Sequence, residues 1–205
     1  REFRALLFRS VSYRCPFRPG ESLLVQGCAS GIGTTAIQSY AARGHTVFAT
    51  AGDAEKVVLC QTLGAARAIN YRTEDFVEIV KAETGGKGVD VILDMVGGDY
   101  IQRNLSAAAI RGRIVNIAYQ NGMQANVNFA PMLMKRLSLL ATTLRARSND
   151  EKAVIRAALL REGWPLIDAG TIQPVVDSTS ALAARGEAPQ RSAGSERAGR
   201  GLRAG

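Results

Sequence analysis

The chain has 205 residues, of which 46% are hydrophobic, and a formal net charge of +8. This length and composition suffice for one domain with a hydrophobic core, and no apolar run approaches the roughly 20 residues of a membrane-spanning helix. The charge is concentrated at the ends, because residues 1–20 carry +4 and residues 178–205 carry +3, so the remaining +1 excludes the clustered cations of a nucleic-acid-binding surface.

The few cysteine and histidine residues lack the spacing of a metal site. Cys15, Cys28 and Cys60 are far apart in the sequence, and His45 is the only histidine. An odd, small number of cysteines predicts reduced thiols, and the first residues do not resemble a secretory signal, so we expect a cytoplasmic protein. His45 has no partner for acid–base chemistry and is expected to be a surface residue.

From residue 21 the apolar pattern alternates between strands and helices. In chain order we expect a strand at 22–26, a helix at 32–43, a strand at 45–50, a helix at 54–63, a strand at 66–71, a helix at 73–84, a strand at 88–96, a helix at 99–109 and a strand at 112–119. A short helix at 131–135, a strand at 137–145, a helix at 149–163 and an extended piece at 172–177 follow. Strands separated by helices predict an α/β fold, a doubly wound, Rossmann-like parallel sheet with helices on both faces.

The helix expected at 73–84 has a candidate cap and a candidate buried stripe. Thr73 is the expected N-cap, because a threonine side chain accepts a hydrogen bond from the first turn. Phe76, Ile79 and Val80 follow the helical spacing i, i+3, i+4 and predict one buried stripe.

A glycine-rich turn joins the first predicted strand to the first helix, in the sequence SLLVQGCASGIGTTAIQ (22–38). Gly27, Gly31 and Gly33 allow a tight turn and a close approach of the backbone to a ligand. Such a turn presents free N–H groups at the start of a helix, where the helix dipole favours an anion. At the switch point of a doubly wound sheet, we expect this anion to be the pyrophosphate of a dinucleotide.

The end of the second strand bears on whether the dinucleotide carries a 2′-phosphate. The strand closes with Thr50-Ala51-Gly52, where a carboxylate would instead favour NAD by binding the ribose hydroxyls. Lys56 follows on the next helix and suits the charge of a 2′-phosphate, which favours NADPH. Two alternatives remain. Asp53 binds a ribose hydroxyl, in which case NAD is the preferred cofactor, or Lys56 is an exposed lysine on a helix that Asp53 caps.

The glycine spacing also fits the short-chain dehydrogenases, whose catalytic tyrosine and lysine lie four residues apart on one helix. None of the tyrosines after the turn is followed by a lysine four residues later, as inspection of Tyr40, Tyr71, Tyr100 and Tyr119 shows. The sequence therefore disfavours that family.

Residues 19–177 instead resemble the cofactor domain of the medium-chain dehydrogenase/reductase superfamily, and within it the zinc-free, zeta-crystallin-like NADPH:quinone oxidoreductases. The stretches PGESLLVQG, SGIGTTAIQ, ATAGDAEK, LGAARAINYRTEDF, GGKGVDVILDMVGGDY and LATTLRARS carry the resemblance in the family's order and spacing. It implies hydride transfer from NADPH to a quinone or a similar conjugated carbonyl acceptor, without a metal. One departure is Ser30, where the family often has glycine; a serine fits there, and its hydroxyl can donate to a phosphate.

The resemblance also implies cofactor contacts. Ser30, Gly31 and Ile32 match the turn that meets the pyrophosphate, and Gly52 and Lys56 match the 2′-phosphate pocket. Tyr71 matches a tyrosine that closes over the same end, and the ends of the fourth and fifth strands match positions beside the nicotinamide. Core packing is the alternative for Val96 and Ile117, and covering of the sheet edge is the alternative for Tyr71. The predicted cofactor site comprises Gly27, Ser30, Gly31, Ile32, Gly33, Thr50, Gly52, Lys56, Tyr71, Val96, Gly97, Ile117, Ala118 and Tyr119, with no assigned catalytic residue and no metal ligand.

Three regions are predicted: an atypical N-terminal extension (1–18), an NADP-binding domain (19–177) and a disordered Arg/Ala/Gly-rich tail (178–205). The family has a further N-terminal domain that supplies most of the substrate cleft, and neither end of this chain resembles the family there. We expect both ends to be out-of-frame or truncated products flanking an intact cofactor domain. Residues 137–145 match the family's dimer edge, which implies a homodimer, with aggregation as the alternative.

Two functions from different classes follow. The first is an NADPH-dependent oxidoreductase of the quinone-reductase type, represented by its cofactor domain. The second is a non-catalytic NADP-binding module or inactive fragment. A relative of the enoyl reductases is a weaker third hypothesis. Neither nucleic acid nor a membrane is an expected partner.

Overall fold

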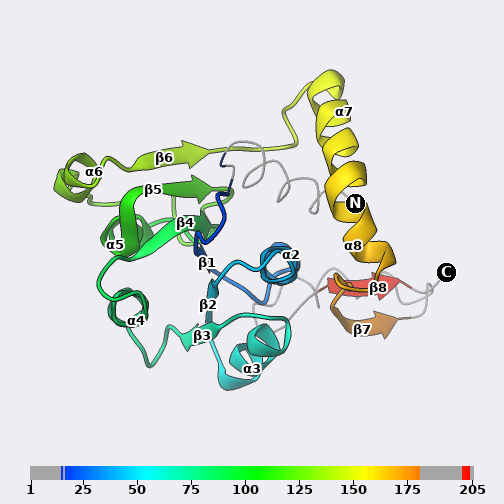
Figure 1. Ribbon diagram of the computed structural model, residues 1–205, viewed down its shortest axis with the longest axis horizontal. Helices are drawn as coiled ribbons and strands as arrows, with labels where there is room; N and C mark the ends of the chain where they lie inside the picture. Colours follow the sequence, from blue (N-terminus) through cyan, green and yellow to red (C-terminus); the bar gives the residue numbers. More distant parts are fainter. Residues whose placement is uncertain (1–14, 16, 181–199, 204–205) are drawn as a thin grey trace.

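The computed structural model describes residue 15, residues 17–180 and residues 200–203. A parallel six-stranded sheet forms its centre, in the order β3-β2-β1-β4-β5-β6 (Figure 1). The strands are β1 (Leu23–Val25), β2 (Val47–Ala51), β3 (Arg67–Asn70), β4 (Val89–Asp94), β5 (Ala108–Asn116) and β6 (Ser138–Ala141). The order reverses between β1 and β4, which is the switch point of a doubly wound sheet, so the predicted fold class is confirmed.

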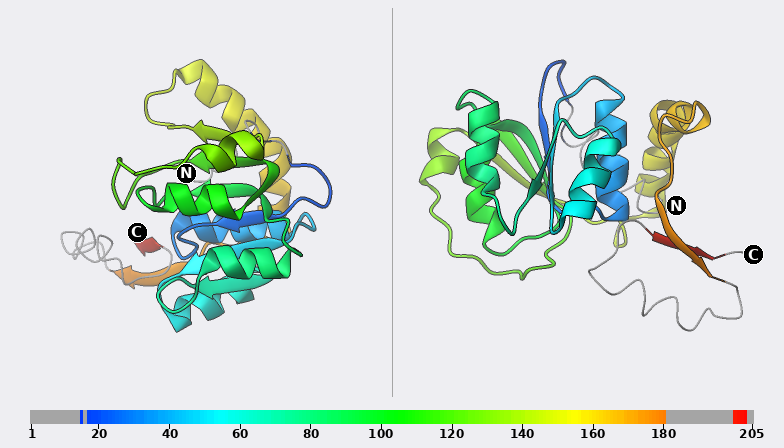
Figure 2. Two further views of the ribbon diagram at one scale, coloured as in Figure 1. Left: turned by 90° about the vertical axis from the view of Figure 1, so that its left-hand side faces the viewer. Right: turned by 90° about the horizontal axis from the view of Figure 1, so that it is seen from below.

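Helices cover both faces of the sheet, as Figure 2 shows. Helices α2 (Gly31–Ala41) and α3 (Ala54–Thr62) lie on one face, and α4 (Phe76–Glu83) and α5 (Tyr100–Ala107) lie on the other. Successive residues of β1 point to opposite faces: Leu23 packs in a core cluster with Ile37 of α2, whereas Leu24 packs with Phe76 of α4. The strand is buried on both sides, which explains its uninterrupted apolar sequence.

The C-terminal helices depart from the single helix expected at 149–163. Helix α7 (Asn149–Ala158) begins with a capping box between Ser148 and Glu151, passes through a π-helical turn η2 (Leu159–Gly163) and continues as α8 (Trp164–Asp168). Pro165 lies in the first turn of α8, where a proline is tolerated because the backbone N–H that it lacks would have no acceptor within that helix. Helix α6 (Ala130–Met134) precedes β6.

A separate parallel pair of strands, β7 (Val176–Ser180) and β8 (Arg200–Arg203), forms a second, two-stranded sheet (Figure 1). Residues 178–180 and 200–203 are therefore strands within the region that the sequence predicts to be disordered. The rest of that tail, and residues 1–14 and 16 of the predicted extension, lie outside the described residues. Within the described part of the chain, no helix combines the length and the apolar character needed to cross a membrane.

The cap of α4 corrects one detail of the sequence analysis. The helix begins at Phe76, and Asp75 is its N-cap, with the carboxylate accepting the N–H of Val77 at 2.7 Å. Thr73 lies before the helix in a turn, where its N–H donates to the carbonyl of Asn70. An aspartate satisfies the free N–H groups better than a threonine because its charge also interacts favourably with the helix dipole. The buried residues of α4 are Phe76, Val77 and Val80, whereas Ile79 is only partly buried.

The expectation of three reduced thiols is also wrong. Cys28 in the glycine-rich turn and Cys60 on α3 form a disulfide, although 32 residues separate them in the sequence. The fold brings their Cα atoms to 6.6 Å, a proximity that sequence spacing did not reveal. Cys15 is a free, buried cysteine.

An ion pair fastens the segment before β1 to β5. Both guanidinium NH₂ groups of Arg113 donate to the Glu21 carboxylate at 2.7 Å, and Nε donates to the thiol of Cys15 at 3.0 Å. Hydrogen bonding from Arg113 lowers the pKa of Glu21 below its usual 4.5. The stabilising effect of the pair is therefore present above that value and is lost as the pH falls through the lowered pKa.

We expect the substitution Glu21→Gln to reduce thermal stability most near neutral pH. The difference from the wild type should shrink as the pH falls below 4.5, because the wild-type carboxylate then becomes protonated too. Thermal denaturation of both proteins over a pH series measures this difference. A difference that stays constant across the series would contradict the role assigned to the pair.

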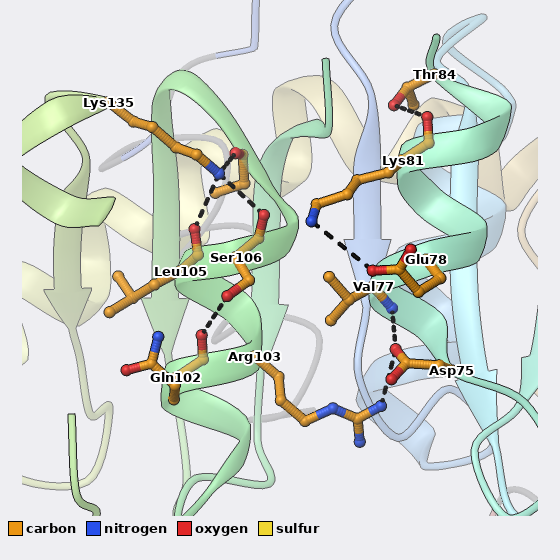
Figure 3. Close-up of polar contacts among 11 residues, drawn as sticks. Asp75, Val77, Glu78, Lys81, Thr84, Gln102, Arg103, Leu105, Ser106 and Lys135 are labelled. Atoms are coloured by element: carbon orange, nitrogen blue, oxygen red, sulfur yellow. Dashed lines mark hydrogen bonds and ion pairs between the residues drawn. The ribbon is translucent and has the colours of Figure 1, made fainter. Parts of the chain in front are cut away.

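A second cation fastens α6 to the end of α5 (Figure 3). The ammonium group of Lys135 donates to the carbonyls of Leu105, Ser106 and Ala108 at 3.2, 2.9 and 2.8 Å. The last carbonyls of a helix have no internal donor, and the helix dipole favours a cation beside them. Burial and the neighbouring Lys81 lower the pKa of Lys135.

We expect Lys135→Met to reduce the free energy of unfolding by about 1–3 kcal/mol, because it leaves these carbonyls without a charged donor. Lys81 on α4 is the matched control: its ammonium lies 3.8 Å from Glu78 in an exposed ion pair, so Lys81→Met should change stability by less than about 0.5 kcal/mol. Denaturant titration of the two variants measures both values. Equal losses would show that the carbonyl contacts are unimportant.

Candidate functional site

The candidate site lies at the carboxyl edge of the sheet, where the loops after β1 to β5 meet. Backbone hydrogen bonds join neighbouring loops. The N–H of Cys28 donates to the carbonyl of Thr50 at 3.0 Å, that of Tyr71 to Ala51 at 3.0 Å, and that of Ile117 to Asp94 at 2.9 Å. The predicted site residues, although spread from 27 to 119 in the sequence, therefore lie on one edge, at the switch point where ligands of doubly wound sheets bind.

The turn after β1 leaves backbone donors free at the start of α2. Among the described residues, the N–H groups of Gly31 and Ile32 have no hydrogen-bond acceptor. The N–H of Gly33 is engaged, because Ser30 is the N-cap and its hydroxyl oxygen accepts that hydrogen bond at 3.0 Å. The same hydroxyl donates to the sulfur of Met95 at 3.1 Å. The hydroxyl predicted to donate to a phosphate is thus occupied within the protein, whereas two amides at an 11-residue helix remain free for an anion.

Two glycines of the turn are required by its geometry. Gly27 has φ of +72°, a left-handed conformation that other residues rarely adopt. A Cβ atom on Gly33 would lie 2.4 Å from the carbonyl oxygen of Cys28, so α2 packs directly on the turn. The backbone of the turn is therefore fixed close against the helix, with the amides of Gly31 and Ile32 at its start.

The loops after β2 and β3 form a second part of the site. A Cβ atom on Gly52 would lie 2.6 Å from the Tyr71 hydroxyl, so the tyrosine covers this glycine, with 40% of its surface exposed. Lys56 forms an ion pair with Asp53 at 2.8 Å, and Asp53 also caps α3 by accepting the N–H of Lys56 at 2.8 Å. The Lys56 hydrogen bonds lower the pKa of Asp53, with a smaller effect of the Arg72 charge. The two residues that favour different cofactors are therefore paired, and a 2′-phosphate would compete with Asp53 for the Lys56 ammonium.

The loops after β4 and β5 form the third part. Gly97 has φ of +70°, and a Cβ there would lie 2.6 Å from the ring of Tyr119, so this ring lies against the glycine. The N–H of Asn121 donates to the carbonyl of Val96 at 2.7 Å and closes the contact between the loops. Ile117 and Ala118 are partly buried and pack against the core cluster of the α2 face. Val96 is also partly buried, so packing contributes at each of these three positions.

Comparison with known proteins identifies the family of this chain. The model of the family described as zinc-binding dehydrogenase matches residues 31–159, from the start of α2 to the end of α7. The chain belongs to the zinc-binding dehydrogenase family. Within the medium-chain dehydrogenase/reductase superfamily, its relatives place it in the zinc-free quinone oxidoreductase branch.

Three of the proteins and structures that this chain resembles illustrate the likeness. Quinone oxidoreductase 1 of Escherichia coli (strain K12) is 31% identical over 179 residues, which cover 78% of this chain and 54% of that protein. The crystal structure of an Escherichia coli quinone oxidoreductase complexed with NADPH superposes with a TM-score of 0.82 at 29% identity, over 99% of this chain and 63% of that chain. The crystal structure of an NAD-dependent alcohol dehydrogenase gives a TM-score of 0.84 at 28% identity, over 98% of this chain and 56% of that chain. The chain spans between 38% and 54% of the length of the first curated relatives that it matches.

No group of three or more His, Cys, Asp or Glu side chains in the described part of this dehydrogenase domain is arranged to hold a metal ion. His45 is half-buried, its Nδ1 lies 3.0 Å from the Glu21 carbonyl oxygen, and its ring contacts Phe17 and Tyr40. It is thus a packed residue before β2, away from the edge that holds the site.

A set of buried polar residues lies beneath the site, and the sequence patterns did not predict it. Thr50 was expected to contact the cofactor, but its side chain is fully buried and donates to the Gln26 side chain at 2.7 Å. Asp94, Asn104 and Asn116 are buried in the same region. Burial raises the pKa of Asp94, against the opposing effect of hydrogen bonds from Val96, Gly97, Asn116 and Asn104. A signal was present, because polar residues lie at or next to the carboxyl ends of strands of the sheet: Gln26 follows β1, Thr50 is the last residue but one of β2, and Asp94 and Asn116 end β4 and β5.

Proposed function

We propose that this chain binds NADPH and forms the cofactor half of an oxidoreductase that reduces a quinone or a similar conjugated carbonyl compound. The observation that carries the proposal is the pair of free amides, from Gly31 and Ile32, at the start of a helix on the switch-point edge. The fit of a dinucleotide to these loops is supported by Gly33 and Gly52, which keep the backbone bare. A Cβ atom at either position would lie within 2.6 Å of neighbouring protein atoms.

Each part of the site has a role in this proposal. The amides of Gly31 and Ile32 hold the pyrophosphate, and Lys56 with Tyr71 holds the 2′-phosphate. Gly97 and Tyr119 shield the nicotinamide side from water. When bound, NADPH supplies the hydride, so the protein need only bind, orient and exclude water. No side chain of the described residues is assigned as an acid or base.

The experiment that tests this proposal separates binding from catalysis. Adding the protein to NADPH should change the fluorescence of the reduced nicotinamide in a saturable way. A quinone is then added, and oxidation is followed by the loss of that fluorescence. Binding with oxidation supports the oxidoreductase; binding without oxidation supports the alternative, a non-catalytic NADP-binding module, for this chain. No binding would contradict both.

We also propose that two copies pair through β6, the edge strand of the sheet. Leu139 of β6 is 40% exposed, and apolar residues of the preceding α6, Leu133 and Met134, are 79% and 74% exposed. An edge strand with exposed apolar neighbours favours pairing with a second copy. Sedimentation velocity should show a dimer; a monomer or a broad range of aggregates would contradict this arrangement.

We also propose a cytoplasmic location, although the Cys28–Cys60 disulfide is unusual for that compartment.

A further inference from the structure

We propose that Asp94 and Asn104 are positioning residues, which hold the pyrophosphate turn and the nicotinamide-side loops of the proposed site in one fixed arrangement. This inference rests on the proposed NADPH binding and concerns what makes that binding productive. Neither side chain contacts the cofactor in this account, since both are fully buried beneath the loops.

Asp94, at the end of β4, joins the turn after its own strand to β5 and to α5. One carboxylate oxygen, Oδ1, accepts the backbone N–H groups of Val96 and Gly97 at 2.7 and 3.2 Å. The other, Oδ2, accepts the side-chain amides of Asn116 on β5 and Asn104 on α5, at 2.8 and 3.0 Å. The carboxylate is the acceptor in all four hydrogen bonds, so a single side chain fixes the turn after β4 relative to β5 and α5.

Asn104 extends these contacts to the glycine-rich turn. Its side-chain oxygen accepts the amide of Gln26 at 2.9 Å, and the Gln26 oxygen accepts the Thr50 hydroxyl at 2.7 Å. The Thr50 hydroxyl oxygen in turn accepts the N–H of Gly27 at 3.3 Å. A continuous chain of hydrogen bonds thus runs from Gly97, beside Tyr119, to Gly27, at the start of the pyrophosphate turn.

The chemistry of this network requires the carboxylate form of Asp94. Substitution by asparagine preserves the shape but turns one acceptor into a donor. In one orientation, the NH₂ group of the new asparagine faces the side-chain donors of Asn104 and Asn116. In the other orientation, it faces the backbone N–H groups of Val96 and Gly97. Either orientation leaves two buried donors without an acceptor, which moves one loop or the other.

The burial of an ionised group here indicates a role beyond stability. A buried charge costs free energy even when it is well hydrogen-bonded, and apolar replacements of buried polar groups are often neutral or stabilising. A network that connects the loops of a site can instead give specificity of arrangement. The network lies only at the carboxyl ends of the strands, directly beneath the loops that it connects.

The test compares Asp94→Asn with a matched change on the same strand. Asp90, at the other end of β4, accepts hydrogen bonds from the N–H and hydroxyl of Ser22 at 2.8 and 2.9 Å, so Asp90→Asn removes the same charge at the opposite edge. Each full-length variant is titrated with NADPH and with 2′,5′-ADP, which carries the adenosine with its 2′- and 5′-phosphates but lacks the nicotinamide half of the cofactor. Thermal melting of each variant measures stability in parallel.

We expect Asp94→Asn to weaken NADPH binding at least about tenfold while changing 2′,5′-ADP affinity by less than about twofold. Asp90→Asn should leave both affinities within about twofold. Unchanged NADPH affinity in Asp94→Asn would overturn the inference, and so would equal losses for both ligands, since a general loss of structure affects both.

A second variant covers the case in which Asp94→Asn does not fold. Asn104→Leu has a similar size, removes both the donor to Asp94 and the acceptor of the Gln26 amide, and leaves Asp94 its three other donors. It should show the same selective loss of NADPH affinity, and the absence of this selective loss would overturn the inference. If the wild type binds neither ligand, the proposed function itself fails; if it binds both and the variants behave like it, only the inference fails.

Discussion

Lys56→Glu is expected to weaken NADPH binding by about 100-fold and NADH binding by less than about threefold. The side chain is only 13% exposed and belongs to the first turn of α3, which closely follows Gly52 in the chain, at the proposed 2′-phosphate end. The substitution removes a charge-assisted hydrogen bond to the phosphate and places a like charge beside it. NADH has no 2′-phosphate, so its binding should be little affected. Fluorescence titration with the two cofactors measures both changes.

Two further variants sharpen this prediction. Lys87→Glu changes an exposed lysine just before β4, at the opposite edge of the sheet, and should alter neither affinity. Asp53→Asn keeps a residue type that can cap α3 but removes the carboxylate that pairs with Lys56, so NADPH should bind at least as tightly as to the wild type. If Asp53→Asn instead weakens NADH binding selectively, Asp53 binds the ribose and NAD is the preferred cofactor. Equal losses for both cofactors in Lys56→Glu would show that the adenosine end lies elsewhere.

Gly33→Val is expected to weaken NADPH and NADH equally, by about 100-fold or more. The added Cβ would lie 2.4 Å from the Cys28 carbonyl oxygen and 2.6 Å from its carbonyl carbon and Cα, so the backbone of the turn or of α2 must move. That movement displaces the amides of Gly31 and Ile32, which both cofactors would use. Overpacking of this kind costs about 1–3 kcal/mol of stability.

The control for Gly33→Val is Ala42→Val, an exposed substitution at the C-cap of the same helix. It introduces the same β-branched side chain far from the turn and should leave both affinities unchanged. Titration with both cofactors, with circular dichroism to confirm folding, measures the effect. Wild-type affinity in folded Gly33→Val protein would contradict the assigned role of the turn.

Much of the fold could be predicted from the sequence because it depends on local patterns. The regular alternation of buried strands and amphipathic helices predicted each element of the six-stranded sheet and its parallel, doubly wound form. The glycines at 27, 31 and 33 predicted the turn, and its geometry requires two of them, Gly27 for its positive φ and Gly33 for its close contact with Cys28. Boundaries were less accurate: residues 137–145 were expected in a strand, but β6 is only Ser138–Ala141, because the sequence pattern does not show where pairing with β5 ends.

The missed features depend on contacts between residues distant in the sequence. The Cys28–Cys60 disulfide joins the turn to α3, and nothing in the spacing of the two cysteines indicates that the fold brings them together. Asp94 on β4, Asn104 on α5 and Gln26 in the turn after β1 are far apart in the sequence and become one network only when the strands align. Ser30 was correctly placed in the turn, but its role as the cap of α2 depends on the local geometry of Gly33 and Met95.

The central claim is that the turn after β1 holds the cofactor pyrophosphate. A crystal structure of the protein with NADPH tests it most directly. The account predicts pyrophosphate oxygens within about 3 Å of the N–H groups of Gly31 and Ile32, with the 2′-phosphate beside Lys56. A cofactor bound elsewhere, or those two amides bonded to acceptors within the protein while NADPH is bound, would contradict it.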